Sequence, residues 1–401
     1  MCQNNSNFNS GIKPACRLGS VSEYYFSRKG KEIARLNAEG KDIISLAIGS
    51  PDMPPSQATV DELCRVASLP AAHGYQPTMG TPELREAMAR WYKRWFNVEL
   101  DPKSELQPLI GSKEGILHVT LAFVNPGEKV LVPNPGYQIF SAGPRLCDAE
   151  VWEYPLLEEH RFLPQLDEIP EEVARRARYM VVSYPANPIC RTAPESFYRD
   201  LIAFAKKYEI IILHDNAYSD IIYDGRRGGS FLEYEGAKEV GIEFYSLSKS
   251  FNYTGARMSF AVGNREIVQK FRALRTQFDY GTFLPVQYGA AAALNGPFDG
   301  VEKQCQLYEE RNHVLCGGLR EIGWNVPDSE GTMFVWAPLP EGYTNSEEFC
   351  VELMERSGVI CVPGSSFGSL GEGYVRMALV LPPEELKKAV ESIRVSGILK
   401  K

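Results

Sequence analysis

The feature that most constrains the fold of this 401-residue chain is a strand, turn and helix rhythm that repeats from about residue 105 to 265. Several of its strands are continuous apolar runs, which is typical of strands buried on both faces of a parallel sheet. Helical stretches such as Lys113–Phe123 and Ser196–Lys207 lie between them. This alternation predicts an α/β fold with a mostly parallel sheet and right-handed crossovers. The expected strands are Gln107–Ile110, Lys129–Pro133, Glu150–Tyr154, Arg178–Tyr184, Glu209–His214, Ile242–Leu247 and Met258–Val262.

Further elements flank this region on both sides, as expected for a chain long enough to form about two domains. Residues 1 to about 20 are rich in Asn, Ser and Gly, and we expect a loose arm there. A helix is expected from Ser22 to about Asn37, followed by a strand over Asp42–Ile48. The C-terminal unit should contain a helix at Gly300–Glu321, strand Thr332–Pro338, helix Ser346–Ser357, strands Val359–Val362 and Tyr374–Ala378, and a helix from Pro383.

Composition excludes several classes of partner. The formal net charge is −8 and no basic stripe is present, so nucleic acid and anionic membrane are not expected as partners. No apolar run approaches the roughly 18 residues that cross a bilayer, and the N-terminus lacks the pattern of a signal or transit peptide. Nine cysteines without a C-x-x-C pair fit a reducing cytoplasm. The five histidines show no metal-binding spacing, so we expect no metal.

A lysine with unusual neighbours follows one of the expected strands. Lys249 comes just after Ile242–Leu247, is flanked by serines, and precedes Arg257 by eight residues. Open sheets bind ligands at the carboxyl ends of their strands, and a desolvated lysine there favours Schiff-base chemistry. Arg257 and Ser246 are suited to bind a phosphate. Alone, Lys249 would be read as a surface lysine and Arg257 as a structural arginine.

Polar side chains also follow two other buried strands. Asp215 comes two residues after the apolar run at 210–213, where a carboxylate is costly unless it meets a cation such as a pyridinium nitrogen. Tyr218 can reach the same ring, and the Asn187 amide can donate to a ring oxygen. Singly, Asp215 is equally well explained as a helix cap, and Asn187-Pro188 is more commonly a simple turn.

Two further motifs complete the set. The turn Gly111–Gly115 leads from the first core strand into a helix, whose free amides at Ser112 and Lys113 can bind phosphate, although it is neither a P-loop nor a dinucleotide motif. Tyr137 offers an aromatic face, although most tyrosines only pack. Together, the motifs supply a covalent amine, an anion cradle, a pyridinium partner and a stacking face.

With these motifs in this order, the chain resembles the fold-type I pyridoxal-phosphate enzymes and, within them, the class I/II aminotransferases. The resemblance extends from Leu46-Ala-Ile-Gly-Ser-Pro-Asp to Val375-Arg-Met. The stretches Gly111–Ile116 and Asp279–Gln287 are most similar to the alanine (glutamate–pyruvate) and LL-diaminopimelate aminotransferase branch. The family resemblance implies a three-layer α/β/α large domain and a smaller α+β domain built from both chain ends. We expect residues 1–50 to form the arm and part of the small domain, 51–290 the large cofactor-binding domain, and 291–401 the small C-terminal domain.

The resemblance also implies a role for each matched residue, with pyridoxal 5′-phosphate as the cofactor. Lys249 is similar to the Schiff-base lysine, and Asp215 to the partner of the ring nitrogen. The remaining matches are Tyr218 and Asn187 at the ring hydroxyl, Ser112, Lys113, Ser246 and Arg257 at the phosphate, Tyr137 stacked on the ring, Tyr75 reaching the phosphate of the neighbouring subunit in a homodimer, and Arg376 with Gly49 at the substrate carboxylate.

Two positions depart from the family. The family usually continues Asn-Pro with Thr-Gly, whereas this chain has Ile189-Cys190, and we expect the turn to differ because glycine permits tight backbone turns. Ser259 stands where the family usually has glycine. Neither change removes a chemical group.

The implied activity moves an amino group between an L-amino acid and a 2-oxo acid. Lys249 would act as base and acid while Asp215 keeps the ring nitrogen protonated. A lyase or synthase using the same cofactor, such as a C–S lyase, shares these residues and stays an alternative. A regulatory ligand-binding module is a second alternative, but only about 40 residues precede the first strand and they lack a basic helix-turn-helix pattern.

Overall fold

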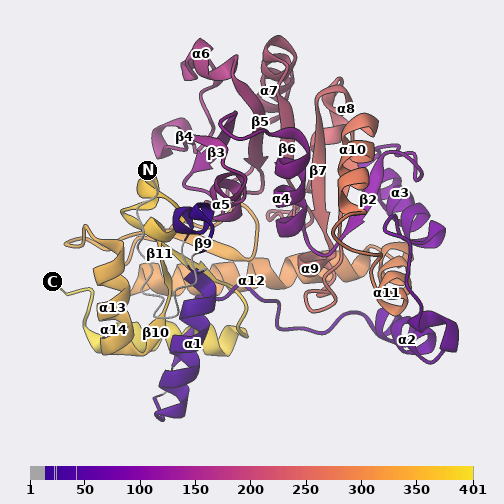
Figure 1. Cartoon of the computed structure of the whole chain (residues 1–401). Coiled ribbons are helices and arrows are strands. Elements are labelled where there is room, and N and C mark those ends of the chain that lie inside the picture. Colours follow the sequence, from indigo (N-terminus) through magenta and orange to yellow (C-terminus); the bar gives the residue numbers. More distant parts are fainter. Residues whose placement is uncertain (1–13, 22, 24, 42, 401) are drawn as a thin grey trace.

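The computed structural model describes residues 14–21, 23, 25–41 and 43–400 (Figure 1). Most of the expected N-terminal arm, and Ser22 at the start of the expected first helix, lie outside the described residues. The helix itself, α1, spans Tyr25–Ala38.

The expected mostly parallel sheet is present and has seven strands in the order β2-β8-β7-β6-β5-β3-β4. All strands run parallel except β8, which is antiparallel to both of its neighbours. The seven predicted strands are confirmed with shifts of one or two residues at their ends. Their bounds are β2 Leu106–Leu109, β3 Lys129–Asn134, β4 Glu150–Pro155, β5 Ala177–Ser183, β6 Ile211–Asp215, β7 Gly241–Ser246 and β8 Ser259–Gly263.

Helices cover both faces of this sheet, so the three-layer arrangement is confirmed. One face packs against α4, α5 and α10 through apolar residues such as Ile116, Phe140 and Phe271. The other packs against α3 and α7 through residues such as Trp91 and Leu201. The bounds of these helices are α3 Pro82–Phe96, α4 Ser112–Phe123, α5 Ile139–Leu146, α7 Glu195–Tyr208 and α10 Arg265–Arg275; shorter helices are α6 Glu171–Ala174, α8 Ala237–Val240 and α9 Leu247–Ser250.

The C-terminal segment forms two small sheets. Strands β9 (Phe334–Pro338), β12 (Tyr374–Ala378) and β11 (Val362–Pro363) form an antiparallel sheet, and β1 (Ile44–Ser45) pairs in parallel with β10 (Val359–Ile360). The expected strand Val359–Val362 is therefore divided, because the chain passes from one sheet to the other at Cys361. The expected strand Asp42–Ile48 is shorter than predicted, because only two of its residues have partners in β10.

Long helices support these sheets. Figure 1 shows α12 (Asp299–Glu321) extending beneath the large sheet toward the small sheets, where it packs on α14 (Pro383–Ser396). Helix α13 (Ser346–Ser357) packs on α14 as well, and α11 (Leu284–Asn295) packs on α2 (Gln57–Ala67) and α3.

No helix among the described residues is long and apolar enough to span a membrane. The same residues contain no group of three His, Cys, Asp or Glu side chains placed to hold a metal ion. Seven described cysteines are free thiols, whereas Cys16 is disulfide-bonded.

Candidate active site

The sheet brings the predicted motifs to one edge. The loops after β2, β3, β5, β6 and β7 meet there because these strands are parallel, and Arg257 reaches the same edge because antiparallel β8 begins just after it. They enclose a cavity of about 300 Å³. Every predicted site residue except Tyr75 lines it: Gly49, Ser112, Lys113, Tyr137, Asn187, Asp215, Tyr218, Ser246, Lys249, Arg257 and Arg376.

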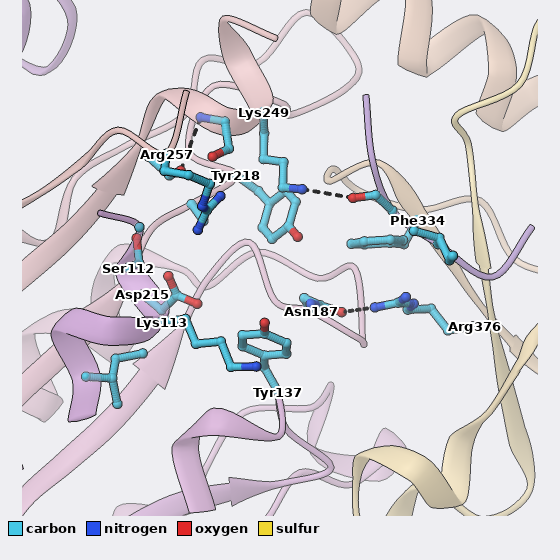
Figure 2. Close-up of a pocket in the computed structure, with 17 residues that line it drawn as sticks. Ser112, Lys113, Tyr137, Asn187, Asp215, Tyr218, Lys249, Arg257, Phe334 and Arg376 are labelled. Atoms are coloured by element: carbon cyan, nitrogen blue, oxygen red, sulfur yellow. Dashed lines mark hydrogen bonds between the residues drawn. The ribbon is translucent and has the colours of Figure 1, made fainter. Parts of the chain in front are cut away.

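Lys249 projects into the cavity from the short helix α9, directly after β7. Its Nζ donates a 2.9 Å hydrogen bond to the backbone carbonyl of Gly49 (Figure 2). Burial, the largest cause, and the positive charges of Arg376 and Arg257 together lower the pKa of Lys249 to about 8. An amine with this pKa is partly neutral near neutral pH and can act as a nucleophile or base.

Asp215 is the last residue of β6 and is buried in the cavity wall. Burial raises its pKa to about 6, against the opposing effect of His214. Its Oδ1 atom has no hydrogen-bond partner among the described residues. A buried carboxylate oxygen of this kind is suited to receive a cation, since an uncompensated charge is costly.

The start of α4 forms an anion cradle with Arg257. Gly111 caps this twelve-residue helix with φ 101°, and the buried Ser112 Oγ has no hydrogen-bond partner among the described residues. Arg257 lies so close that a Cβ on Gly111 would stand 2.1 Å from its guanidinium. Helix N-terminal amides and a guanidinium both favour phosphate. Burial and the nearby Arg257 lower the pKa of Lys113, the next residue of the helix.

The opposite end of the cavity is built around Arg376, on β12. Its Nη1 donates to Asn187 Oδ1 at 2.8 Å, and its Nη2 donates to the backbone carbonyl of Ala47 at 3.0 Å. The guanidinium carbon lies 3.9 Å from the centre of the Phe334 ring. Figure 2 shows this group at one end of the cavity and Ser112 and Arg257 at the other, with Lys249 between them.

Tyr137 and Tyr75 are both predicted to contact the cofactor, but only Tyr137 lies at the cavity of its own chain. Tyr137 is half-buried and lines the cavity. Tyr75 does not line it; the side chain is 87% exposed and stacks on Tyr280 with ring centres 4.6 Å apart. Tyr75 therefore does not contribute to the cavity of its own chain.

Sequence reasoning missed Phe334, which forms an aromatic wall of the cavity and packs on both Arg376 and Tyr218. It lies in an ordinary apolar strand, so no local pattern distinguishes it. It also missed the second chamber, of about 530 Å³, which shares Lys113 and Tyr137 with the first cavity.

The two positions that depart from the family, Cys190 and Ser259, are both buried. Cys190 adopts φ 62°, the left-handed region that favours glycine, and its N–H bonds to the Ala186 carbonyl at 2.7 Å. A non-glycine residue thus occupies a tight left-handed turn here, at a strain of about 1–3 kcal/mol, and the expected difference from the turn of the family stays a prediction. Ser259 is fully buried in β8 and does not line the cavity.

These residues fit pyridoxal 5′-phosphate in three respects. The cradle offers helix amides, a buried hydroxyl and a guanidinium for the phosphate. The Asp215 Oδ1 atom is suited to a protonated ring nitrogen, and the Lys249 amine, with its lowered pKa, to an aldehyde. When bound, this cofactor acts as an electron sink for carbanion chemistry.

Comparison with known proteins gives one consistent family. Residues 41–393 match the family described as "Aminotransferase class I and II". The chain is 44% identical to the LL-diaminopimelate aminotransferase of Halothermothrix orenii over 96% of this chain and 99% of that one. It is 42% identical to the same enzyme of Moorella thermoacetica, over 96% and 98%. The structure matches substrate-bound BacF from Bacillus subtilis with a TM-score of 0.92 and 36% identity, covering 96% and 97% of the two chains.

These matches support amino-group transfer and give no support to a lyase or to a regulatory module. Cofactor and fold type follow from the same family, because its members are fold-type I enzymes that depend on pyridoxal 5′-phosphate. The chain therefore belongs to the class I and II aminotransferases, and it moves an amino group between an L-amino acid and a 2-oxo acid.

Proposed function

We propose that Lys249 forms the covalent bond to the cofactor and moves the proton of the substrate α-carbon. The observation that carries this proposal is the place of Lys249 between Arg376 and the Arg257 cradle, where burial and both charges lower its pKa to about 8. A positioned amine with a pKa near the working pH is an effective nucleophile and general base.

Borohydride reduction of the holoenzyme, followed by peptide mapping, tests this assignment. We expect the reduced cofactor on Lys249 and none on Lys113, the other lysine that lines the cavity. Lys113→Gln is the control and should keep the adduct. An adduct on Lys113, or on any other lysine, would refute the assignment.

The other cavity residues are proposed to hold the ring and the phosphate. Asp215 would pair with the ring nitrogen, Tyr218 and Asn187 would contact the ring hydroxyl, and Tyr137 would stack on the ring face. The phosphate would lie against the amides of Ser112 and Lys113, the Ser246 hydroxyl and Arg257. The unpartnered Asp215 Oδ1 and Ser112 Oγ support these roles.

Arg376 is proposed to bind the substrate α-carboxylate, with Asn187 and the backbone of Gly49 beside it. Arg376 is 2% exposed, and its guanidinium is held by Asn187 and Ala47 on one side and the Phe334 ring on another. Such fixing suits a bidentate pair with a carboxylate.

LL-diaminopimelate is the proposed amino donor, since the relatives at 42–44% identity bear that name. This donor carries a second amino group and a second carboxylate at its far end. The 530 Å³ chamber next to Lys113 and Tyr137 contains side chains of both signs, which supports the choice: Arg28, Lys113, Arg145, Glu23, Glu153 and Glu347.

A donor panel with 2-oxoglutarate as acceptor tests the substrate. We expect the highest kcat/KM for LL-diaminopimelate, a lower value for L-2-aminopimelate, which lacks only the distal amino group, and a still lower value for L-alanine. Equal or higher kcat/KM for L-alanine would rule out this donor while leaving amino-group transfer itself intact.

We also propose a homodimer in which Tyr75 reaches the phosphate site of the neighbouring subunit. Tyr75, Tyr280, Phe278 and Phe283 are large exposed side chains, at 87%, 65%, 56% and 47%. Large exposed apolar side chains grouped in this way are typical of a face that a partner covers. An isologous pair is the simplest closed assembly.

Mixed dimers test this arrangement. Lys249→Ala and Tyr75→Ala subunits should each be impaired alone. A mixed dimer should regain one intact site, because the Lys249→Ala subunit supplies Tyr75 to the site that keeps its own Lys249. Light scattering that shows a fully active monomer, or mixing that restores nothing, would contradict the shared site.

The division into an N-terminal segment 1–50, a large domain 51–290 and a small domain 291–401 is likewise proposed. The pairing of β1 with β10 supports placing residues near 45 with the C-terminal unit. A cytoplasmic location is proposed as well; the seven free cysteines support it, whereas the disulfide bond of Cys16 does not.

A further inference from the structure

A buried polar pair lies next to the Asp215 carboxylate but does not line the cavity. His214 on β6 and Glu243 on β7 are direct partners in the register of these parallel strands. Both side chains are fully buried, and His214 Nδ1 lies 3.0 Å from a Glu243 carboxylate oxygen. No step of the proposed function uses either residue.

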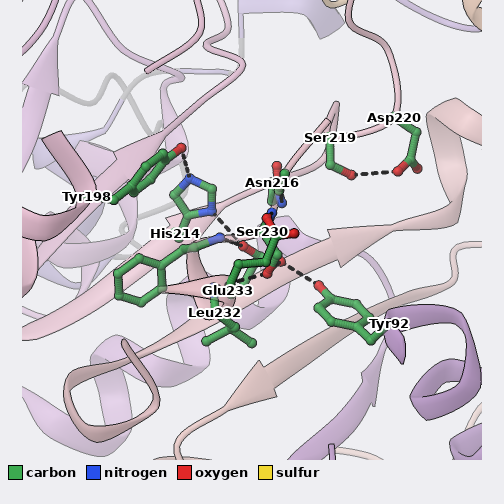
Figure 3. A network of polar contacts seen from close by, with 12 residues as sticks. Tyr92, Tyr198, His214, Asn216, Ser219, Asp220, Ser230, Leu232 and Glu233 are labelled. Carbon is green, nitrogen blue, oxygen red and sulfur yellow. Dashed lines mark hydrogen bonds and ion pairs between the residues drawn. The ribbon is translucent and has the colours of Figure 1, made fainter. Parts of the chain in front are cut away.

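The Glu243 carboxylate is surrounded by donors, of which Figure 3 labels Tyr92, His214 and Ser230. Besides His214, the donors are the Tyr92 hydroxyl at 2.6 Å, the Ser230 hydroxyl at 2.8 Å and the Phe231 backbone N–H at 2.8 Å. Burial acts to raise the pKa of Glu243, but the contacts with His214 and the Tyr92 hydrogen bond together outweigh it and lower the pKa. Glu243 is therefore a buried anion at neutral pH.

The His214 ring is held at both nitrogens. Its Nε2 lies 3.3 Å from the Tyr198 hydroxyl on α7, and its Nδ1 faces Glu243. The Phe231 ring packs on it at a centre-to-centre distance of 5.9 Å. The imidazole cannot turn without breaking a contact to α7 or to β7.

This pair fixes the backbone from which Asp215 projects. Asp215 follows His214 and is paired with Phe244, the residue after Glu243. The next residue, Asn216, donates its backbone N–H to the Phe244 carbonyl at 2.9 Å. Since successive side chains in a strand point to opposite sides, His214 turns away from the cavity and Asp215 turns into it.

The pair also acts on the charge of Asp215. Burial raises the pKa of Asp215 to about 6, and His214 is the strongest influence that lowers it. Glu243 acts in the same direction as burial. Without the His214 ring, burial and Glu243 would still favour the neutral form of Asp215, whereas the main influence that favours the ionised form would be lost.

Stability alone does not explain such a pair, because a buried ion pair can often be replaced by apolar residues at little cost. We propose that His214 and Glu243 are positioning residues, whose pairing fixes the direction and the ionised state of the Asp215 carboxylate toward the cofactor ring. The inference rests on the role proposed above for Asp215.

The test reads the protonation of the cofactor ring directly. Enzyme reconstituted with ¹⁵N-labelled cofactor reports, through the ring-nitrogen chemical shift, whether that nitrogen carries a proton. His214→Gln removes the imidazole. Tyr198→Phe removes only the hydroxyl that contacts the imidazole, and it serves as the milder variant if His214→Gln does not fold. Tyr179→Phe is the matched control, because it removes a buried hydroxyl that bonds Thr120 at 2.8 Å on the other face of the sheet. Asp215→Asn sets the size of the full effect.

We expect His214→Gln to move the shift toward that of a neutral pyridine, in the same direction as Asp215→Asn. Its kcat should fall by about 10- to 100-fold, by analogy with the loss when partners behind metal ligands are removed, while KM for the donor changes little. Tyr198→Phe should act in the same direction but less, and Tyr179→Phe should leave the shift and kcat unchanged.

Two contrary results are distinguishable. If the folded His214→Gln or Tyr198→Phe enzyme keeps the wild-type shift and kcat while Asp215→Asn changes both, the positioning role is wrong and the proposed function stands. If Asp215→Asn itself leaves the shift unchanged, the proposed role of Asp215 is wrong, and the positioning role is refuted with it.

Discussion

The Lys249 amine donates its 2.9 Å hydrogen bond to the carbonyl of Gly49, a residue 200 positions earlier in the chain. The same segment supplies the Ala47 carbonyl that accepts from Arg376. Gly49 also lies against the Phe334 ring, so closely that a Cβ would stand 2.3 Å from a ring carbon. The segment 47–49 thus connects the lysine to the corner proposed for the substrate carboxylate.

Gly49→Ala should therefore damage substrate binding more than cofactor binding. The added methyl group must displace Phe334 or the segment itself, and overpacking of this kind costs about 1–3 kcal/mol. We expect kcat/KM for the donor to fall by the corresponding factor, while the Kd of the apoenzyme for cofactor changes much less. Gly255→Ala is the control, because a Cβ there meets nothing within 4 Å. Equal loss of cofactor affinity and kcat/KM would contradict this division.

Arg376→Lys should separate charge from geometry. Lysine keeps the positive charge but loses the planar fork that pairs with a carboxylate. We expect an unchanged absorption spectrum of the bound cofactor and a fall in kcat/KM for the amino acid of at least about tenfold, or roughly 1.4 kcal/mol. The corresponding decarboxylated amine should lose much less. Kinetics measured in parallel on the two substrates decide between the two roles, because the loss of a purely structural arginine would lower kcat/KM for both equally.

Gly111→Ala should weaken the phosphate cradle selectively. Alanine at φ 101° is strained, and its Cβ would meet the Arg257 guanidinium at 2.1 Å. We expect the apoenzyme to bind pyridoxal 5′-phosphate more weakly by about 1–3 kcal/mol. Pyridoxal, which lacks the phosphate, should bind the variant and the wild type about equally. Titration of cofactor fluorescence measures both, and an equal loss for the two ligands would place the defect elsewhere.

Asp215→Asn should have opposite effects on turnover and on stability. Turnover should fall by roughly two to four orders of magnitude, by analogy with other positioned charges, while the cofactor remains bound. In the apoenzyme, burial raises the pKa of Asp215 to about 6. Its contribution to the free energy of unfolding is therefore fully present below the usual pKa of an aspartate and is lost as the pH rises through 6. The variant apoenzyme should therefore be more stable than wild type at pH 8, by on the order of 3 kcal/mol, and no more stable at pH 4. Denaturant unfolding at the two pH values measures this difference.

The sheet could be predicted from the sequence because its central strands are buried on both faces and read as uninterrupted apolar runs. The site residues could be found for a related reason, since parallel strands end at a common edge and the polar residues after them must meet. Helix α3 shows that usable signals were also overlooked. Thr81 caps it by accepting from the Leu84 N–H, and Pro82 occupies its first position, a pattern visible in the sequence.

Other features depend on contacts between distant segments and have no local pattern. Phe334 enters the cavity only because β9 pairs with β12, which carries Arg376. His214 and Glu243 look like isolated polar residues in apolar strands until the register of β6 and β7 makes them partners. The direction of Tyr75, away from the cavity of its own chain, is set by its stacking on Tyr280.

The segment that follows β1 meets its C-terminal partner late during synthesis on the ribosome. Ala47 leaves the ribosome early, but its partner Arg376 lies 329 positions later. At typical synthesis rates the segment waits roughly 15–65 s for that partner. The residues of the phosphate cradle, between 111 and 257, are synthesised well before the carboxylate corner can assemble, because that corner needs Arg376. Productive loading with substrate is thus deferred until Arg376 has been synthesised.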